Sequence, residues 1–317
     1  MSEMNVDSTS RAIGMVIGAA IGDALGAPFE FKSAGLYRRT FPEPVVDGIG
    51  EMIGGGFFEW EPGEFTDDTQ MAIALAESIL EAEGFDPATT WRWFTTWAKT
   101  APDVGTTTAA SLNHGAWHDV RMNPNAAPAN GALMRSFVQA AAFLHAPRDV
   151  VRNIVLRQSA LTHPNPVSGW GAWICVEMCR EFIHGTNAFE VLGDLVNATA
   201  EEYRTRFCEI LSPTWSPTEP HESNGSVWGC LAQAVWAVRS TSTFDEAVIA
   251  AIDLGDHADT VGCVAGALAG ARYGVNAIPQ RWKAVVHGRF DGPDGLREYT
   301  ADDLERVTCS LLDLAQD

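Results

Sequence analysis

The stretch VGCVAGALAGARY, residues 261–273, decides what kind of fold this chain can adopt. Glycine recurs there every four residues, at Gly262, Gly266 and Gly270, and alanines occupy several of the positions between and after them. Four residues is close to one helical turn, so the glycines share one helix face. Because glycine is a poor helix former, such a face indicates that another helix backbone lies very close. We expect a central, tightly crossed helix, and its short length and Arg272 exclude a membrane span.

Helical periodicity continues outward from this stretch in both directions. Apolar residues at helical spacing, with capping residues at many of the ends, predict ten further helices. Their expected ranges are 10–25, 69–83, 88–100, 131–144, 148–161, 167–184, 188–200, 227–239, 244–254 and 302–314. No run of alternating polar and apolar residues predicts a strand. The sequence therefore predicts an all-α fold.

Length and composition favour one domain. The 317 residues are 46% hydrophobic, which is enough for an extensive core, and no linker divides them. We expect a single domain over 1–317, with a core of about 11–277 and a C-terminal helical tail over 278–317. The proline-rich segment Leu211–Ser226 is expected to be a surface loop.

Charge and cysteine usage limit the classes of binding partner and the cellular compartment that we expect. A formal net charge of −20 disfavours direct binding to nucleic acid or to anionic membranes. Six cysteines occur without a CxxC pair and are interpreted as reduced core residues. The polar N-terminus does not resemble a leader sequence, so we expect a cytoplasmic protein. Without a coiled-coil pattern, a monomer is the default expectation.

Two acidic turns lie almost two hundred residues apart. The first is FTDDT, which contains Thr66, Asp67 and Asp68, and the second is GDHADT, which contains Asp259 and Thr260. Either turn alone is typical of a helix cap. Neighbouring carboxylates exceed what a cap needs, however, and a cation would relieve their repulsion. If the turns meet in space, their oxygen atoms suit Mg²⁺ or Mn²⁺.

Three other features could belong to the same site. Glu30 follows a small-residue helix end and could bind metal or activate water, or be an exposed residue at a helix stop. The segment NGALMR, residues 130–135, could hold a pyrophosphate on free amides where a helix begins near Ala132, or be only a loop and a cap. His163 could be a ligand-binding residue or a partner of a helix dipole.

Taken in order, the motifs GDALGxxxE, FTDDTQ, NGALMR, ALTHP and DTVGCVAGALAGARYG resemble the ADP-ribosylglycohydrolase family. The match runs from about Ile13 to Ala277. The resemblance implies a compact orthogonal bundle of helices with a cleft that holds two Mg²⁺ or Mn²⁺ ions. It also implies hydrolysis of the bond that joins ADP-ribose to a protein side chain, so ADP-ribosylated protein or ADP-ribose is the expected partner.

Site residues follow from the resemblance position by position. Thr66, Asp67 and Asp68 would hold one metal, Asp259 would be shared, and Thr260 would bind the second. Glu30, Asp67 and Asp68 are the candidate catalytic carboxylates. The ADP-ribose-binding residues would be Asn130, Gly131, Met134, Arg135 and His163.

One departure from the family pattern concerns the second metal. Relatives usually read D-x-D-T at this turn, whereas His257 stands at the first aspartate and Asp256 is displaced by one position. An imidazole can bind Mn²⁺ but is a poor ligand for Mg²⁺. The substitution leaves three outcomes open, namely a preference for Mn²⁺, a single bound ion, or a pocket that has lost activity.

Three functions are therefore compared. The leading hypothesis is a metal-dependent ADP-ribosyl-protein hydrolase, with arginine linkage favoured over serine. The second is an ADP-ribose-binding or structural relative with impaired catalysis, because of His257. The third is a metal-dependent phosphohydrolase, which the oxygen ligands permit and the order of the motifs disfavours.

Overall fold

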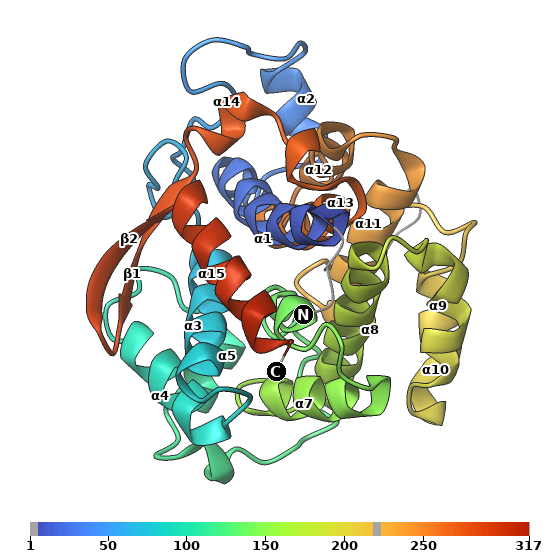
Figure 1. Ribbon diagram of the computed structural model, residues 1–317. Coiled ribbons are helices and arrows are strands. Elements are labelled where there is room, and N and C mark those ends of the chain that lie inside the picture. The colour runs from blue at the N-terminus through green and yellow to red at the C-terminus, as the bar shows by residue number, and fades with distance from the viewer. Residues whose placement is uncertain (1–5, 218–222, 317) are drawn as a thin grey trace.

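The computed structural model describes residues 6–217 and 223–316, and helices dominate it (Figure 1). The helices are α1 (Val6–Gly26), α2 (Leu36–Thr40), α3 (Asp67–Glu81), α4 (Pro87–Trp97), α5 (Thr106–Leu112), α6 (Val138–Ala142), α7 (Arg148–Ala160), α8 (Pro166–Ile183), α9 (Ala188–Asn197), α10 (Glu201–Ile210), α11 (Val227–Ser240), α12 (Phe244–Ile252), α13 (Ala258–Tyr273), α14 (Gln280–Lys283) and α15 (Ala301–Leu314). Single 3₁₀ turns are η1 (Ala27–Phe29), η2 (Trp117–Asp119) and η3 (Val275–Ala277). The prediction of an all-α fold is confirmed.

Helices α1 and α13 cross at the centre of the molecule, with the other helices arranged around them (Figure 1). A Cβ atom built on Gly22 would lie 1.9 Å from the carbonyl oxygen of Gly262, and one on Gly18 would lie 2.5 Å from that of Gly266. Gly14 faces Gly270 in the same way. The close helix partner expected for residues 261–273 is therefore α1, which carries its own glycines every four residues.

The apolar character of α1 reflects its place in the core. By length and composition the segment Ser8–Phe29 could cross a membrane, but all of its most apolar window is buried inside the protein. Ile17, Ile21 and Leu25 are each no more than 2% exposed. The segment is the core helix of this fold.

A β-hairpin corrects the expectation that residues 278–317 form a helical tail. Strand β1 (His287–Gly292) pairs antiparallel with β2 (Gly295–Thr300), with Phe290 opposite Arg297. Burial alternates along β1, but two of its three buried positions are Gly288 and Gly292. Glycine carries no apolar side chain, so the alternation is invisible in the hydropathy pattern.

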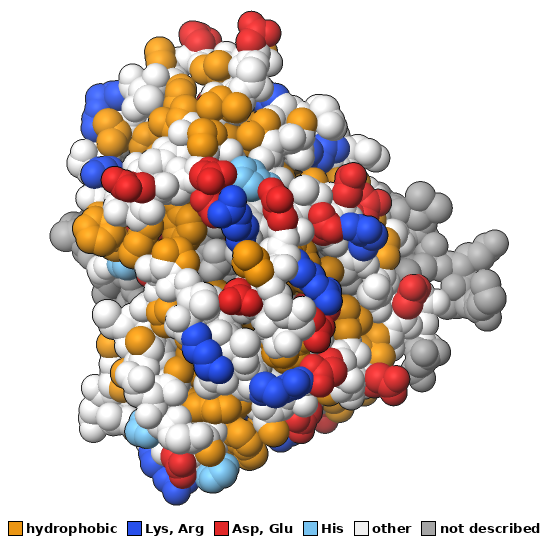
Figure 2. Space-filling model, turned by 90° about the vertical axis from the view of Figure 1, so that its left-hand side faces the viewer, with side chains coloured by type: hydrophobic (Ala, Val, Ile, Leu, Met, Phe, Trp, Pro, Cys, Tyr) orange, Lys and Arg blue, Asp and Glu red, His pale blue; other side chains and the backbone are white. Residues whose placement is uncertain are grey.

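The C-terminal segment packs on the core. The hairpin contacts α3 and α4, and α15 lies against α1, α3 and α6. Leu304, Leu311 and Leu312 of α15 are each no more than 2% exposed. Figure 2 shows the face that carries the hairpin, where acidic and basic side chains are interspersed with apolar ones.

Some helix boundaries differ from the expectation. Residues 131–137 form successive turns, and only Val138–Ala142 is helical in the segment predicted as 131–144. The helices α2, α5, α10 and α14 were not among the predicted ranges. The expected loop 211–226 contains no helix in its described parts, and residues 218–222, with Pro220, lie outside the described residues.

The cysteines are free, but not all of them are core residues. Cys175, Cys179, Cys230 and Cys263 are buried, whereas Cys309 is half-buried and Cys208 is exposed. The interpretation of all six as core thiols is therefore wrong for Cys208.

Candidate functional site

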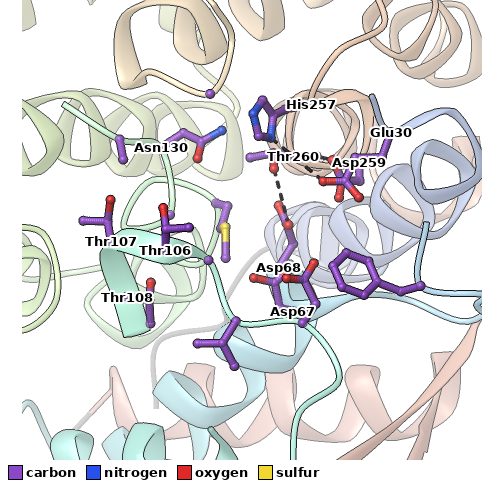
Figure 3. A pocket seen from close by; sticks show the side chains of 18 of the residues that line it. Glu30, Asp67, Asp68, Thr106, Thr107, Thr108, Asn130, His257, Asp259 and Thr260 are labelled. Carbon is purple, nitrogen blue, oxygen red and sulfur yellow. Dashed lines mark hydrogen bonds and ion pairs between the residues drawn. The ribbon is translucent and has the colours of Figure 1, made fainter. Parts of the chain in front are cut away.

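A cavity of about 710 Å³ lies where the ends of several helices converge. The α1–η1 exit, the start of α3, the start of α5, residues 127–134 and the start of α13 all line it. Figure 3 shows Asp67, Asp68, Asp259 and Glu30 on one side of this space and Thr106–Thr108 with Asn130 on the other. The cavity therefore has an acidic end and a neutral polar end.

The first acidic turn starts α3, and hydrogen bonds to Asp23 of α1 hold it in place. Thr66 is the N-cap, and its hydroxyl oxygen accepts a hydrogen bond from the Asp68 amide. The buried Asp23 carboxylate accepts from the Thr66 amide at 3.0 Å, the Thr69 amide at 3.0 Å and the Thr69 hydroxyl at 2.6 Å. With the cap provided by Thr66 and the turn held by Asp23, Asp67 and Asp68 remain free to face the cavity.

The second acidic turn starts α13 and docks on the end of α1. The Phe31 amide donates to the Asp256 carbonyl, and the Asp256 amide donates to the Lys32 carbonyl. Asp256 takes a left-handed conformation, with φ at 56°, and its side chain is exposed and accepts from the Ser223 hydroxyl. The Asp256 carboxylate therefore does not line the cavity, as expected from its displaced position.

The two turns meet in the cavity wall. The hydroxyl of Thr260 donates to Oδ2 of Asp68 at 3.4 Å (Figure 3). Thr66 places its own hydroxyl 3.5 Å from the same oxygen. Carboxylate and hydroxyl oxygens from both turns thus share one small volume.

Glu30, His257 and Asp259 form the second cluster at the acidic end. One ligand atom from each lies within 4.8 Å of those of the other two. Nδ1 of His257 is 4.0 Å from Oε1 of Glu30. Figure 3 shows the imidazole above Glu30, Asp259 and Thr260.

The carboxylates of the acidic end perturb one another. Burial, followed by the charge of Asp259, raises the pKa of Glu30 to about 9. Burial, with Asp23 nearby, raises the pKa of Asp259 to about 8. Burial, followed by the charge of Asp103, raises the pKa of Asp67 well above its usual range, and burial, followed by the charge of Asp259, does the same for Asp68. Such a group of carboxylates is stabilised in its charged form by a bound cation.

The donor set fits a hard divalent cation. Oδ1 of Asp68 is buried and has no hydrogen-bond partner among the described residues. A buried carboxylate oxygen without a partner is costly, and a metal ion would satisfy it. The oxygen-rich surroundings match the ligands that Mg²⁺ and Mn²⁺ prefer.

The neutral end is built on Asn130 and Gly131. The Asn130 amide donates to the Gly225 carbonyl, and its side-chain nitrogen donates to the Asn224 carbonyl at 2.9 Å. A Cβ on Gly131 would lie 2.9 Å from Nε2 of His163, so only glycine lets the imidazole come this close. The predicted helix start near Ala132 is wrong, because the amides of Leu133 and Met134 both donate to the Asn130 carbonyl in a turn.

His163 is held by a buried relay that begins at Arg135. Nη2 of Arg135 donates to Oγ1 of Thr162 at 2.6 Å, and that hydroxyl lies 2.9 Å from Nδ1 of His163. Burial and the positive charge of Arg135 lower the pKa of His163 well below its usual value, so the ring is neutral near pH 7. The hydroxyl then donates to Nδ1, and Nε2 carries the proton toward the cavity.

Comparison with known proteins identifies the family. The family model for ADP-ribosylglycohydrolase matches residues 4–315. The chain belongs to the ADP-ribosylglycohydrolase family. The ADP-ribosyl-dinitrogen reductase glycohydrolase of Rhodospirillum rubrum is 31% identical over 86% of this chain and 88% of its own length. The ADP-ribosylarginine hydrolase Tri1 of Serratia proteamaculans is 30% identical over 87% and 75%.

A solved structure supports the same assignment. A chain from an ADP-ribosylglycohydrolase-related protein complex superposes with a TM-score of 0.78 at 30% identity, and the match covers 98% of this chain and 99% of that one. The fold, the family and the enzyme class agree. This chain is a glycohydrolase.

Most residues expected for an ADP-ribosylglycohydrolase site line the cavity. They are Glu30, Asp67, Asp68, Asn130, Gly131, Met134, His163, His257, Asp259 and Thr260. Two expected residues do not line it. Thr66 lies behind the cavity-facing carboxylates of Asp67 and Asp68 as the N-cap of α3, and Arg135 is fully buried against Phe94 and Thr162. Arg135 is therefore placed to orient His163 rather than to touch a ligand.

Several residues of this glycohydrolase site were not predicted. Asp103 lines the cavity, and burial raises its pKa to about 6. Phe31, Phe57, Phe58 and the threonines 106–108 also line the cavity. Asp23 could have been noticed, because it is the one carboxylate between Ile13 and Leu25 of an otherwise apolar helix. The loop residues carry no comparable signal.

Proposed function

We propose that this glycohydrolase removes ADP-ribose from modified protein side chains in a metal-dependent reaction, with arginine as the favoured linkage. The observation that carries the proposal is the meeting of the two acidic turns through Thr260 and Asp68 in a cavity whose other end is neutral. The arginine linkage is favoured because a relative similar over most of its length is named an ADP-ribosylarginine hydrolase.

The neutral end of the cavity suits the ADP part of the substrate. Asn130, Gly131 and Met134 line it without adding negative charge, and Nε2–H of neutral His163 can donate to a ribose or phosphate oxygen. The threonines of α5 offer hydroxyl groups on the same side. A substrate bound this way would have its scissile ribose at the acidic end.

Mg²⁺ or Mn²⁺ would be held at the acidic end. Asp67 and Asp68 offer oxygen ligands on one side, with the Thr66 hydroxyl behind them 3.5 Å from Oδ2 of Asp68, and Asp259, Thr260 and His257 offer ligands on the other. When bound, such ions orient ribose hydroxyls and acidify water. Asp23 keeps the Asp67–Asp68 turn fixed throughout, because three donors from that turn converge on its carboxylate.

Glycoside hydrolysis passes through an oxocarbenium-like state, so the chain must place negative charge near the ribose and take a proton from water. Glu30, Asp67 and Asp68 are the cavity-facing carboxylates proposed for this work. Glu30 approaches from the end of α1 and the two aspartates from α3, so they can reach different sides of a bound ribose. The amide variants Glu30→Gln, Asp67→Asn and Asp68→Asn would identify the proton acceptor by their pH–rate profiles.

The test is release of free ADP-ribose from arginine- and serine-ADP-ribosylated proteins with Mg²⁺, Mn²⁺ or EDTA. We expect metal-dependent release from the arginine-linked substrate and loss of release in Asp67→Ala. Release from the serine-linked substrate alone would show that serine, and not arginine, is the favoured linkage. Release that EDTA does not affect would overturn the metal requirement.

A second candidate is an ADP-ribose-binding protein with impaired catalysis, and His257 is the observation that favours it. Binding of ADP-ribose without release from either substrate, together with activity gained in His257→Asp, would support this second function. Release of phosphate or AMP in place of intact ADP-ribose would point to a phosphohydrolase and contradict both.

A further inference from the structure

His257 stands at the rim of the acidic end with one ring nitrogen turned toward two carboxylates. Its Nδ1 lies 4.0 Å from Oε1 of Glu30, and the ligand atoms of Glu30, His257 and Asp259 are all within 4.8 Å of one another. Two ligands of one ion with metal–ligand distances of about 2.0–2.2 Å lie up to about 4.4 Å apart. The three side chains thus need only small rotations to hold the same ion.

The imidazole is held in this orientation from three sides. The backbone amide of His257 donates to Oδ1 of Asn224 at 3.0 Å, which anchors the turn. The ring of Phe31 packs edge-on against the imidazole, with 5.4 Å between ring centroids. A Cβ on Gly225 would lie 2.7 Å from Nε2, so the opposite edge of the ring lies against the Gly225 backbone. Nδ1 is consequently the nitrogen that faces Glu30.

A simple ion pair does not account for this arrangement. A separation of 4.0 Å exceeds the 2.7–3.2 Å of a hydrogen bond between nitrogen and oxygen, so no proton is shared directly. Glu30 is 6% and Asp259 is 2% exposed, so both carboxylates are largely withdrawn from water. An ion between the three groups would satisfy both carboxylates and the nitrogen at once.

We propose that Nδ1 of His257 ligates a divalent cation together with Glu30 and Asp259, and that this site binds a first-row transition-metal ion such as Mn²⁺ in preference to Mg²⁺. Imidazole nitrogen is a good ligand for transition metals, whereas Mg²⁺ selects oxygen ligands. The inference deepens the proposed function, since it rests on the same cleft and names the ion that the cleft selects. Restoring a carboxylate at residue 257 would return the preference toward Mg²⁺.

The experiment is pulsed electron paramagnetic resonance of Mn²⁺ bound to the whole protein, which detects a coordinated ¹⁴N nucleus without any turnover. We expect ¹⁴N coupling in the wild type and none in His257→Asp with Mn²⁺ still bound. His163→Asn is the matched control, because His163 is the other histidine among the described residues that line the cavity, and it should keep the coupling. Bound Mn²⁺ without ¹⁴N coupling in the wild type, or coupling that persists in His257→Asp, would overturn the proposal.

Competition gives a second readout. Titration of Mg²⁺ against bound Mn²⁺ should show the Mn²⁺ preference falling about tenfold in His257→Asp. Gly225→Ala should weaken Mn²⁺ binding by about tenfold or more, because its methyl group would displace the imidazole. The inference would be contradicted if the Mn²⁺ preference of His257→Asp and the Mn²⁺ affinity of Gly225→Ala both equalled those of the wild type. Two variants are used so that poor folding of one does not prevent the test.

The outcome is distinguishable from failure of the proposed function. EDTA-sensitive ADP-ribose release with no ¹⁴N coupling would leave the hydrolase intact and remove His257 from its metal site. Clear ¹⁴N coupling with no release from any ADP-ribosylated protein would keep the metal site and overturn the hydrolase. Absence of bound Mn²⁺ in the wild type would overturn the inference directly.

Discussion

The hydroxyl of Thr260 donates to the carboxylate of Asp68 across 192 residues of sequence. Thr260 lies in the first turn of α13 and Asp68 in the first turn of α3, so two helix starts point into one cavity. Each acidic turn caps or begins its own helix, and the remaining oxygens meet between them. The cap interpretation is confirmed for the first turn, where Thr66 caps α3, and the ligand-set interpretation stays a prediction.

Asp68→Asn tests the carboxylates that face the cavity. We expect ADP-ribose release to fall by about a hundredfold or more, because the variant removes a buried carboxylate of the proposed metal site. Asp256→Asn is the matched control, since Asp256 belongs to the second acidic turn but is exposed and asparagine tolerates its left-handed backbone. It should stay within about twofold of wild type. Equal losses in the two variants would show that acidic charge in general, not the cavity geometry, controls activity.

Asp23→Ala tests the support beneath the first turn. The amides of Thr66 and Thr69 and the hydroxyl of Thr69 would lose their buried acceptor. We expect the free energy of unfolding to fall by about 2–3 kcal/mol in urea titrations. Thr69→Val should show part of the effect, whereas Thr69→Ser should be nearer wild type because it keeps the hydroxyl. No loss in any of these variants would contradict a supporting role for Asp23.

Gly22→Ala tests the contact between α1 and α13. The added methyl group would meet the Gly262 carbonyl, so we expect a loss of about 3 kcal/mol or more, or failure to fold. Gly193→Ala in α9 is the control, because its Cβ would meet nothing within 4 Å. It should be neutral or stabilising by up to about 1 kcal/mol. Thermal unfolding of the two variants would compare them directly.

Glu51, which lies outside the acidic end of the cavity, predicts how the free energy of unfolding depends on pH. Burial alone would raise the pKa of Glu51, but hydrogen bonds from Arg281 and Trp282 outweigh it and the pKa lies below its usual value. The stabilisation is therefore present above the unfolded-state pKa and is lost as the pH falls through the folded-state pKa. Glu51→Gln should be less stable than wild type by about 1–3 kcal/mol near neutral pH.

The difference between Glu51→Gln and wild type should shrink as the pH is lowered toward the pKa of Glu51. Urea unfolding of the two proteins at matched pH values measures it, and contributions from the shared acidic cluster cancel in the difference. A difference that stays constant down to acid pH would contradict a charged role for Glu51.

Glycine patterns explain one success and one failure of the sequence-based fold prediction, namely the close helix contact that was expected and the β-hairpin that was missed. In residues 261–273 the repeat predicts a close helix partner, which proved to be α1. In β1 the buried position Gly288 lies against the ring of Phe65, and Gly292 lies against the rings of Phe290 and Trp93, so neighbouring aromatic side chains supply the apolar surface at these positions. A strand that buries glycine gives no alternation of hydropathy, so the hairpin could not be read from the sequence.

Some residues of the candidate site could likewise be predicted from the sequence, and others could not. Asp67, Asp68 and Asp259 were predictable because each stands in a compact acidic turn that begins a helix. Asp103 lies in a loop between α4 and α5 and becomes a site residue only through the way that loop folds over the cavity. Arg135 shows the opposite difference, since its motif suggested ligand contact, whereas its guanidinium lies over the ring of Phe94 in the core.

The contact between α1 and α13 also fixes a register. Gly14, Gly18 and Gly22 meet Gly270, Gly266 and Gly262 in antiparallel order, so the two helices interlock only at steps of four residues. Deleting one residue between Gly22 and Gly26 would turn the end of α1 by about 100° relative to that lock. Glu30 would then move away from Asp259, although the sequence would still contain every residue of the site. The spacing between these two carboxylates is thus set by the length of a helix, and insertions are tolerable in the surface loops but not between the glycines and the site.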